Sequence, residues 1–250
     1  MRIYNAARCF LAALLFPQAC VICGAWVINP QFSPLCRACR DTLETHDCPT
    51  CYYCGLGLPG SLSEEHSTCS LCRSGPRSFD WARSTGPYEG QLRDVIRKYK
   101  FDGFQRLAYP LADRLVEAYS AKRDEFEATC IVPVPLHPKR RRERGFDQTL
   151  ALSRVLGSRL RLPVIPVVRR VRHTLPQFGL DRMERKKNVE KAFQILDPPR
   201  ISGARLLLVD DVMTTGATVD EICSLLREAT QVREIMVLTV ARVQLFRDGF

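Results

Sequence analysis

Hydrophobic and polar residues follow two different patterns along the chain, and the change falls near residue 75. Before that point, apolar residues show little continuous periodicity. After it, two stretches place apolar residues at helical spacing. These are residues 88–103, with Leu92, Val95, Ile96 and Tyr99 on one face, and residues 107–122, with Leu107, Leu111, Leu115 and Tyr119. We predict a helix in each stretch.

From Thr129 onwards, predicted strands alternate with predicted helices. Runs rich in Val, Ile and Leu predict strands at residues 129–135, 163–168, 204–211 and 233–242. Helices are predicted at 145–160, with Leu152, Val155 and Leu156 inward, and at 218–229, with Ile222, Cys223, Leu225 and Leu226 inward. Near-continuous apolar strands separated by helices indicate an α/β fold with a parallel sheet covered on both faces. Ligands of such sheets bind beyond the carboxyl ends of the strands.

Ten of the twelve cysteines lie before residue 75, and eight of them form C-x2-C pairs. The pairs are Cys20/Cys23, Cys36/Cys39, Cys51/Cys54 and Cys69/Cys72. A C-x2-C turn brings two thiolates to one side of a tight knuckle, and two knuckles complete a tetrahedral Zn²⁺ site. We therefore predict two structural zinc ions. The spacing leaves open which pairs share an ion.

Cys48 also forms a C-x2-C with Cys51. We prefer Cys51/Cys54, because Gly55 follows directly and a glycine lets the chain turn there without a Cβ clash, as Gly24 does after Cys23. Cys48 is then a spare thiol. The alternative of disulfides would need an oxidising compartment, which nothing else in the sequence indicates. The remaining cysteines, Cys9, Cys130 and Cys223, lie in apolar surroundings and are expected to be small core residues.

These patterns predict two parts: residues 1–75, an N-terminal helix and a double zinc-ribbon module, and residues 76–250, an α/β domain. So short a first part cannot build a core of its own, so metal must replace it. The apolar run from Cys9 to Phe16 is too short to span a bilayer and lacks a signal-peptide cleavage site. We expect a short packed helix there, and a cytoplasmic protein.

The chain has 37 Lys and Arg against 27 Asp and Glu, a net charge of +10. This balance favours anionic partners such as phosphates, nucleotides or nucleic acid, without choosing among them. A basic segment, "PLHPKRRRERG" (135–145), follows a predicted strand end. It holds Lys139, Arg140, Arg141, Arg142 and Arg144. Some of these would neutralise a pyrophosphate together with Mg²⁺, and Arg144, beside Gly145, is the best candidate. A solvated basic loop or a nucleic-acid patch is the alternative.

The stretch "VDDVMTTGAT" (209–218) places acids at a strand end and hydroxyls at the start of a helix. Free N–H groups at a helix start, beside the hydroxyls of Thr214, Thr215 and Thr218, form a pocket for a phosphate. Gly216 lets the backbone close on that anion, and Ala217 begins the helix. Asp210 and Asp211 would repel a phosphate but suit the vicinal hydroxyls of a sugar. A 5′-phosphorylated ribose has both features. The alternative is a strand end capped by acids for solubility, which would not need this turn.

"LLLVDDVMTTGAT" (206–218) closely resembles the phosphoribosyl-pyrophosphate (PRPP) motif of type I phosphoribosyltransferases. The resemblance implies that fold, with Asp210 and Asp211 at the ribose hydroxyls and Thr214 to Thr218 at the 5′-phosphate. The cysteine pairs, "IVPVPLHPKRRRERGFDQ" (131–148) and "RHTLPQFGLDRMERKKNVEKAF" (172–193) occur in this order in ComF-type competence proteins, and the resemblance covers almost the whole chain. Asp147 stands where that family more usually has Asn.

The resemblance also implies a loop, residues 172–191, that closes over PRPP and excludes water. Gln177, Arg182 and Asn188 lie at its motif positions, His173 is expected to be a residue of this loop rather than a metal ligand, and Arg182 and Lys186 join the two aspartates as catalytic candidates. Thr214 stands where 6-oxopurine salvage enzymes typically have a general-base Asp, which argues against that branch.

Three functions remain open at this point. The first is an accessory protein of DNA uptake that binds PRPP or a phosphorylated nucleotide with Mg²⁺, and contacts single-stranded DNA or a competence helicase. The second is an active transferase that moves ribose 5-phosphate to an unknown nitrogen acceptor. The third is a zinc-ribbon interaction module with an inactive fold, which would bind no PRPP.

Overall fold

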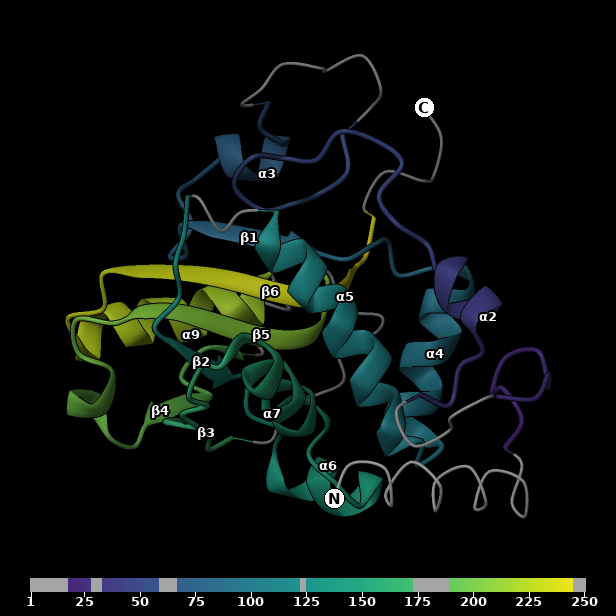
Figure 1. The fold of residues 1–250 in the computed structure, drawn as a ribbon. Coiled ribbons are helices and arrows are strands. Elements are labelled where there is room, and N and C mark those ends of the chain that lie inside the picture. Colours follow the sequence, from purple (N-terminus) through teal and green to yellow (C-terminus); the bar gives the residue numbers. More distant parts are fainter. Residues whose placement is uncertain (1–17, 28–32, 59–66, 122–124, 173–188, 245–250) are drawn as a thin grey trace.

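A computed structural model describes residues 18–27, 33–58, 67–121, 125–172 and 189–244 (Figure 1). Its centre is a four-stranded sheet in the order β1-β6-β5-β2, with every neighbouring pair parallel. The strands are β1 (Trp81–Ser84), β2 (Cys130–Pro133), β5 (Arg205–Met213) and β6 (Glu234–Arg242). The parallel α/β fold predicted from the sequence is confirmed.

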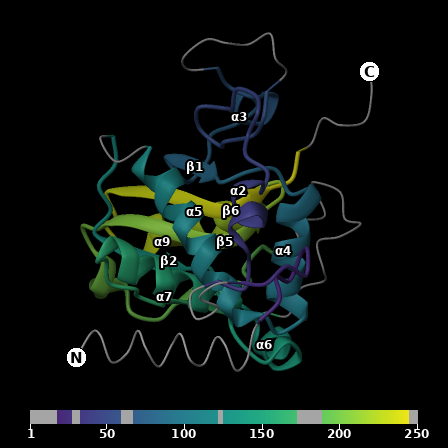
Figure 2. The ribbon, with the colours of Figure 1, turned by 45° about the vertical axis from the view of Figure 1, so that its right-hand side comes forward.

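Side chains alternate between the two faces of the sheet, and each face has its own core. Leu207 and Val209 of β5 pack against α4 (Gly90–Phe101), α5 (Ala108–Ser120) and α7 (Gln148–Leu160). Leu206 and Leu208 face the other way, toward α9 (Ala217–Ala229) and a small antiparallel sheet of β3 (Val168–Arg170) and β4 (Phe193–Ile195). Figure 1 shows α5 and α7 in front of the sheet and α9 behind it, and Figure 2 shows α4 on the same side as α5. A three-layer architecture results.

The helical periodicity predicted the buried faces of two helices correctly. In α4, Leu92, Val95, Ile96 and Tyr99 are all fully buried. In α5, Leu111, Leu115 and Tyr119 are buried as expected, while Leu107 belongs to the short η1 (Gln105–Leu107) just before it. Predicted strands 129–135 and 233–242 correspond to β2 and β6, and predicted helices 145–160 and 218–229 to α7 and α9.

Four details of the prediction are wrong. Residues 163–168 do not form a strand of the main sheet, since Pro163 and Pro166 lack the N–H groups a strand needs and only Val164 bridges to Ile131. The four-residue edge strand β1 was not predicted. Strand β5 continues through Val212 and Met213, which pair with Ala241 and Arg242, so the acids lie inside the strand rather than at its last residue. The basic segment 135–145, for which no helix was predicted, contains α6 (Pro138–Arg144).

The cysteine-rich part consists of two similar ribbons that pack at different places. The first ribbon, residues 18–27 and 33–44, contains α2 (Arg37–Asp41), and the second, residues 49–58 and 67–73, contains α3 (Ser70–Arg73). Buried residues of the first ribbon join the core of the α4 face, and those of the second join the core of the α9 face. Hydrogen bonds also cross the predicted boundary near residue 75; Ala82 N–H, for example, donates to Tyr53 O at 2.7 Å.

One short element completes the part of the chain that the structure describes, η2 (Pro198–Ile201) before β5. The apolar run from Cys9 to Phe16 lies outside the described residues. None of the described helices combines the length and the apolar character that crossing a membrane requires.

Candidate functional site

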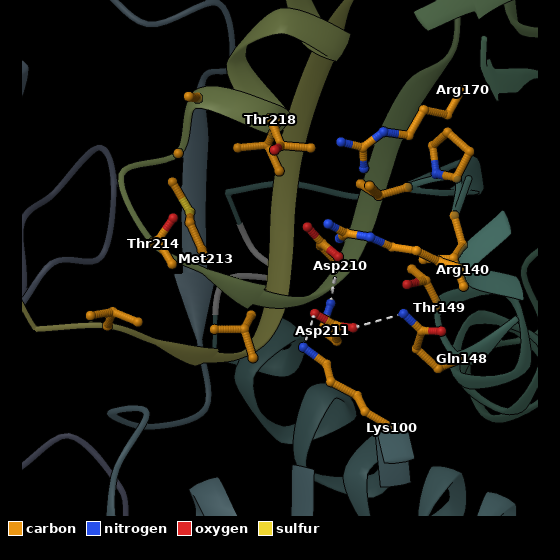
Figure 3. A pocket seen from close by; sticks show the side chains of 18 of the residues that line it. Lys100, Arg140, Gln148, Thr149, Arg170, Asp210, Asp211, Met213, Thr214 and Thr218 are labelled. Carbon is orange, nitrogen blue, oxygen red and sulfur yellow. Dashed lines mark hydrogen bonds and ion pairs between the residues drawn. The ribbon is translucent and has the colours of Figure 1, made fainter. Parts of the chain in front are cut away.

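A cavity of about 510 Å³ opens at the carboxyl ends of β2 and β5 (Figure 3). Its walls come from the end of β5, the start of α9, helices α4, α6 and α7, and strand β3. This is the place where parallel α/β sheets bind ligands. We call this cavity the pocket.

Both aspartates of the motif line the pocket. Asp211 is 8% exposed, and its Oδ1 pairs with Lys100 Nζ at 2.7 Å. Gln148, the first residue of α7, donates from Nε2 to Asp211 Oδ2 at 3.2 Å. Asp210 is half-buried, and its Oδ1 accepts the backbone N–H of Asp211 at 2.8 Å. Asp211 is therefore held in place by protein groups, and Asp210 is the more accessible acid.

The two carboxyl groups have opposite pKa shifts. Burial, together with the nearby charge of Asp211, raises the pKa of Asp210 to about 7. Burial alone would also raise the pKa of Asp211, but the charge and hydrogen bond of Lys100 outweigh it, and the pKa is lowered. At neutral pH, Asp211 is the fixed negative charge of the pair.

The turn after β5 leads directly into α9. Gly216 is the N-cap residue of α9 with φ 85°, and a Cβ there would lie 2.6 Å from Met213 Cε. Only glycine fits without strain. Thr214, Gly216, Ala217 and Thr218 line the pocket. Thr215 is buried instead, and its Oγ1 accepts the N–H of Ala217 at 3.4 Å, so it shapes the turn rather than facing the cavity.

Four cationic side chains surround the acids: Lys100 from α4, Arg140 and Arg144 from α6, and Arg170 from β3. Arg144 was the candidate ligand from the sequence, and its guanidinium also stacks 4.9 Å from the Phe101 ring centroid. Burial and the charge of Arg140 lower the pKa of Arg170 to about 10, and burial likewise lowers that of Arg140. Figure 3 shows Arg140 and Arg170 reaching toward Asp210. The pocket thus places two acids among four cationic side chains.

Sequence reasoning missed several of these residues. Lys100 and Arg170 reach the pocket from two separate elements, and no local motif marks them. Gln148 did carry a signal, because it ends the family stretch 131–148 and begins a helix directly after Asp147, whose Oδ1 accepts the N–H of Leu150 at 3.0 Å. Arg182 and Lys186, with Gln177, Asn188 and His173, lie outside the described residues.

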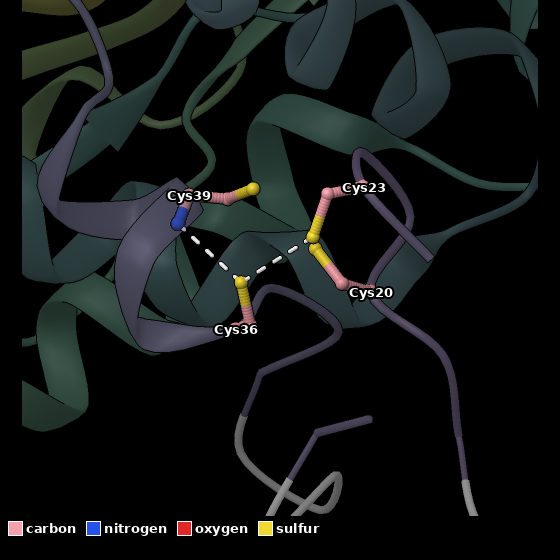
Figure 4. Close-up of side chains that lie close together, drawn as sticks. All are labelled: Cys20, Cys23, Cys36 and Cys39. Carbon is pink, nitrogen blue, oxygen red and sulfur yellow. Dashed lines mark hydrogen bonds between the residues drawn. The ribbon is translucent and has the colours of Figure 1, made fainter. Parts of the chain in front are cut away.

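The eight paired cysteines form two clusters. The first cluster is Cys20, Cys23, Cys36 and Cys39 (Figure 4), and the second cluster is Cys51, Cys54, Cys69 and Cys72. Within each, the four Sγ atoms lie within 4.8 Å of one another. Consecutive pairs therefore belong together, which the spacing had left open. Cys48 belongs to neither cluster. Gly24 and Gly55 both have positive φ, 73° and 64°, as the turn requires.

The sulfur geometry fits a zinc ion in each cluster. Zn–S bonds of about 2.3 Å in a tetrahedron give S···S edges of about 3.8 Å. Cys23 and Cys36 Sγ are 3.7 Å apart, and Cys54 and Cys69 Sγ are 3.5 Å apart. Every described cysteine is a free thiol. Hydrogen bonds with Cys54 and Cys72 lower the pKa of Cys51, and the contact with Cys51 raises the pKa of Cys54 to about 11.

Fold and site together define the class of protein. Residues 11–74 match the family described as the double zinc ribbon domain. The rest is a parallel α/β fold, with the two acids and the glycine turn at the carboxyl end of a central strand.

Relatives of the whole chain identify the family. The protein named competence protein F from Haemophilus influenzae is 33% identical over 217 residues, covering 83% of this chain and 90% of that protein. DNA utilization protein YhgH from Escherichia coli is 32% identical, covering 85% and 92%. Competence protein ComFC from Bacillus subtilis is 25% identical, covering 94% of each. This chain belongs to the ComF family of competence proteins.

Solved structures with lower similarity include adenine phosphoribosyltransferase from Saccharomyces cerevisiae, with a TM-score of 0.36, 15% identity and coverage of 56% of this chain and 79% of that one. Glutamine PRPP amidotransferase from B. subtilis has a TM-score of 0.36 and 18% identity, and covers 58% of this chain and 30% of that one.

Proposed function

We propose that this protein binds PRPP, or another 5′-phosphorylated ribose such as a nucleotide, together with Mg²⁺ in the pocket, and that it serves DNA uptake. One observation supports this most directly: the two aspartates and the turn into α9 line the same cavity. Carboxylates accept hydrogen bonds from ribose hydroxyls, and the start of a helix binds phosphate. The cytoplasm is the location we propose, since four-thiol metal sites need reduced cysteines.

Different residues of the pocket would contact different parts of the ligand. Asp210, the more accessible acid, accepts from the ribose hydroxyls, while Lys100 and Gln148 hold Asp211 beside it. Thr214 and Thr218 line the phosphate end. Arg140, Arg144 and Arg170 supply positive charge for a pyrophosphate. Mg²⁺ is bound in proteins by one or two carboxylates plus substrate oxygens, and Asp210 and Asp211 fit that role. When bound, Mg²⁺ neutralises part of the diphosphate charge.

Calorimetry with PRPP and Mg²⁺ tests this proposal. We expect wild type to bind and Asp210→Asn or Asp211→Asn to bind at least tenfold more weakly. Asp113→Asn is the matched control, because Asp113 is an exposed acid on α5 paired with Arg159 at 2.9 Å. The proposal fails if wild type does not bind, or if the pocket variants bind as tightly as the control.

An active transferase is the second candidate, and the three arginines beside the acids favour it. In that reaction an amine nitrogen bonds to C1 of ribose, the C1–O bond breaks with its electron pair leaving on pyrophosphate, and the amine loses a proton. The arginines would stabilise the leaving charge. Pyrophosphate release over a panel of amines and bases, abolished in Asp211→Asn, would establish it. No release with any acceptor would leave binding as the function.

DNA contact is the third part of the proposal. Phe101 and Phe104 are 63% and 39% exposed at the end of α4. Arg144 lies over Phe101, and Lys98 lies 5.9 Å from the Phe104 ring centroid. Exposed aromatics beside cations bind single strands by base stacking and charge. The relatives named for competence and for DNA utilization support this role, and a competence helicase is the protein partner we propose.

Fluorescence anisotropy with a labelled single-stranded oligothymidine at several salt concentrations tests DNA contact. We expect affinity to fall as salt rises, and the double variant Phe101→Ala/Phe104→Ala to bind about tenfold more weakly, since one stacked base is worth about 1–3 kcal/mol. Leu196→Ala, which removes another exposed apolar side chain, serves as the control. Equal binding by both variants, or no salt-dependent binding by wild type, contradicts DNA contact at this surface.

A further inference from the structure

Arg242, the last residue of β6, is a charged side chain buried beside the second cluster. It is 1% exposed, and its Nη2 lies 3.5 Å from Cys54 Sγ as a hydrogen-bond donor. Its Nε and Nη1 are buried without a hydrogen-bond partner among the described residues. A guanidinium this deep is strongly unfavourable unless a negative charge lies close to it.

The second cluster supplies that charge when it holds a metal. Four thiolates around one divalent ion leave a net charge of two minus, whereas four thiols leave none. Arg77, a half-buried arginine, adds positive charge nearby, and its own acidic partner Asp220 is 3.9 Å away. The surroundings of Arg242 therefore require an anionic cluster.

The backbone of the same residue holds one side of the pocket. Arg242 N–H donates to Gly86 O at 3.0 Å, and its carbonyl accepts the N–H of Tyr88 at 2.8 Å. Across the sheet it pairs with Met213, whose carbonyl accepts the N–H of Val243 at 2.9 Å. Tyr88, Met213 and Val243 all line the pocket.

We propose that Arg242 is a positioning residue that couples the second cluster to the pocket. The metal-loaded, anionic cluster neutralises its guanidinium, and this fixes the end of β6 on which Tyr88, Met213 and Val243 are held. No guanidinium donates a hydrogen bond to a sulfur of the first cluster within the described part of the chain, so the coupling belongs to the second cluster. This coupling sets the shape of the pocket, whether or not the pocket takes PRPP.

Metal release from the full-length, zinc-loaded chain tests the coupling. A colorimetric chelator follows the two zinc ions, and hydrogen–deuterium exchange follows the backbone. In Arg242→Met we expect one zinc to leave at least tenfold faster than in wild type, with faster amide exchange at residues 86–88 and 242–243. Arg242→Lys keeps the charge and should stay within about threefold of wild type.

Arg114→Met is the matched control, because Arg114 is a half-buried arginine that donates to Glu44 O at 2.6 Å and to Thr85 rather than to a cysteine. Its two zinc ions should leave at wild-type rates. Unchanged zinc release in Arg242→Met, or the same acceleration in Arg114→Met, overturns the proposal. So does faster zinc release without any change in exchange at residues 86–88.

A second variant decides the case if Arg242→Met does not fold. Replacing one thiolate by neutral imidazole in Cys72→His lowers the negative charge of the cluster to one minus. Added to Arg242→Met, it should restore a soluble chain with two zinc ions. If the double variant stays unfolded while Arg242→Lys is also lost, the shape of the arginine rather than its charge matters, and the proposal is overturned.

Discussion

The two cysteine clusters have nearly the same local geometry. In each, the glycine after the first knuckle donates its N–H to the first cysteine's carbonyl at 2.9 Å, Gly24 to Cys20 and Gly55 to Cys51. Each knuckle is closed by an isolated antiparallel bridge, and each second pair lies at the start of a short helix, α2 or α3. The C-x2-C-Gly pattern accounts for the likeness of the first knuckles, while each second pair is followed by an arginine inside its helix.

The surroundings of the two clusters differ much more. In the first ribbon, Cys23 is exposed and Trp26 is 68% exposed. In the second ribbon, Cys51, Cys54 and Leu56 are fully buried. The first ribbon contributes to the core on the α4 face, and the second lies in the core on the α9 face of the same sheet. A metal-binding motif therefore determines its own turn, while the burial of its ribbon in the core determines how much of the fold depends on it.

The largest expected effect compares one cysteine from each cluster. Cys54→Ser removes a fully buried ligand and leaves Arg242 without its counter-charge, so we expect the α/β domain to lose cooperative unfolding, because structural zinc contributes about 10–16 kcal/mol. Cys23→Ser, at an exposed ligand, should keep a cooperative melt with a lower midpoint. Circular dichroism melts and zinc content measure both. If both variants lost cooperative unfolding to the same extent, the two clusters would not differ in their importance for the fold.

The next effect concerns the far end of α4. Lys100→Met leaves Asp211 buried without its ion-pair partner, which should cost about 3–5 kcal/mol in urea unfolding at pH 7. The lowered pKa of Asp211 contributes stability above its unfolded pKa, and this contribution is lost as pH falls. The difference in unfolding free energy between Lys100→Met and wild type should therefore become smaller toward about pH 4. Lys98→Met, two residues away beside Phe104, is the control. A difference in unfolding free energy that does not change with pH would contradict a stabilising ion pair between Lys100 and Asp211.

A smaller effect is expected where the first ribbon joins α4. The Glu44 carboxylate accepts the N–H groups of Gln91 and Leu92 at 2.7 and 2.6 Å and so caps the helix from outside. Glu44→Ala should lower the free energy of unfolding by about 1–2 kcal/mol, and Glu44→Gln, which keeps an acceptor, by less. Urea denaturation measures both. Asp41→Ala, an exposed acid of the same ribbon, should change little. Equal losses of unfolding free energy in Glu44→Ala and Glu44→Gln would show that the Glu44 side chain does not cap α4.

The sequence predicted those features that a single local pattern determines. The buried face of α4, the knuckle turns and the acid–threonine stretch each follow from a short motif. Contacts between distant segments could not be predicted in this way: Lys100, Arg170 and Arg242 reach their partners because of how the elements pack. Strand β1 was not predicted, because four residues are too few to show a pattern. The grouping of the cysteine pairs was left open, because spacing does not specify which two pairs come together.

The smallest expected effect separates Cys48 from the second cluster. Its thiol is half-buried, and a Cβ at Gly57 would lie 3.0 Å from its sulfur, but it is not among the four clustered sulfurs. The first ribbon supports this assignment, because the matching position three residues before Cys20 is Pro17. Cys48→Ser should therefore retain two zinc ions, with unfolding free energy within about 0.5 kcal/mol of wild type. Cys54→Ser in the same zinc assay is the comparison. Loss of one zinc in Cys48→Ser would instead make Cys48 and Cys51 the metal-binding pair, and the two ribbons would no longer be equivalent.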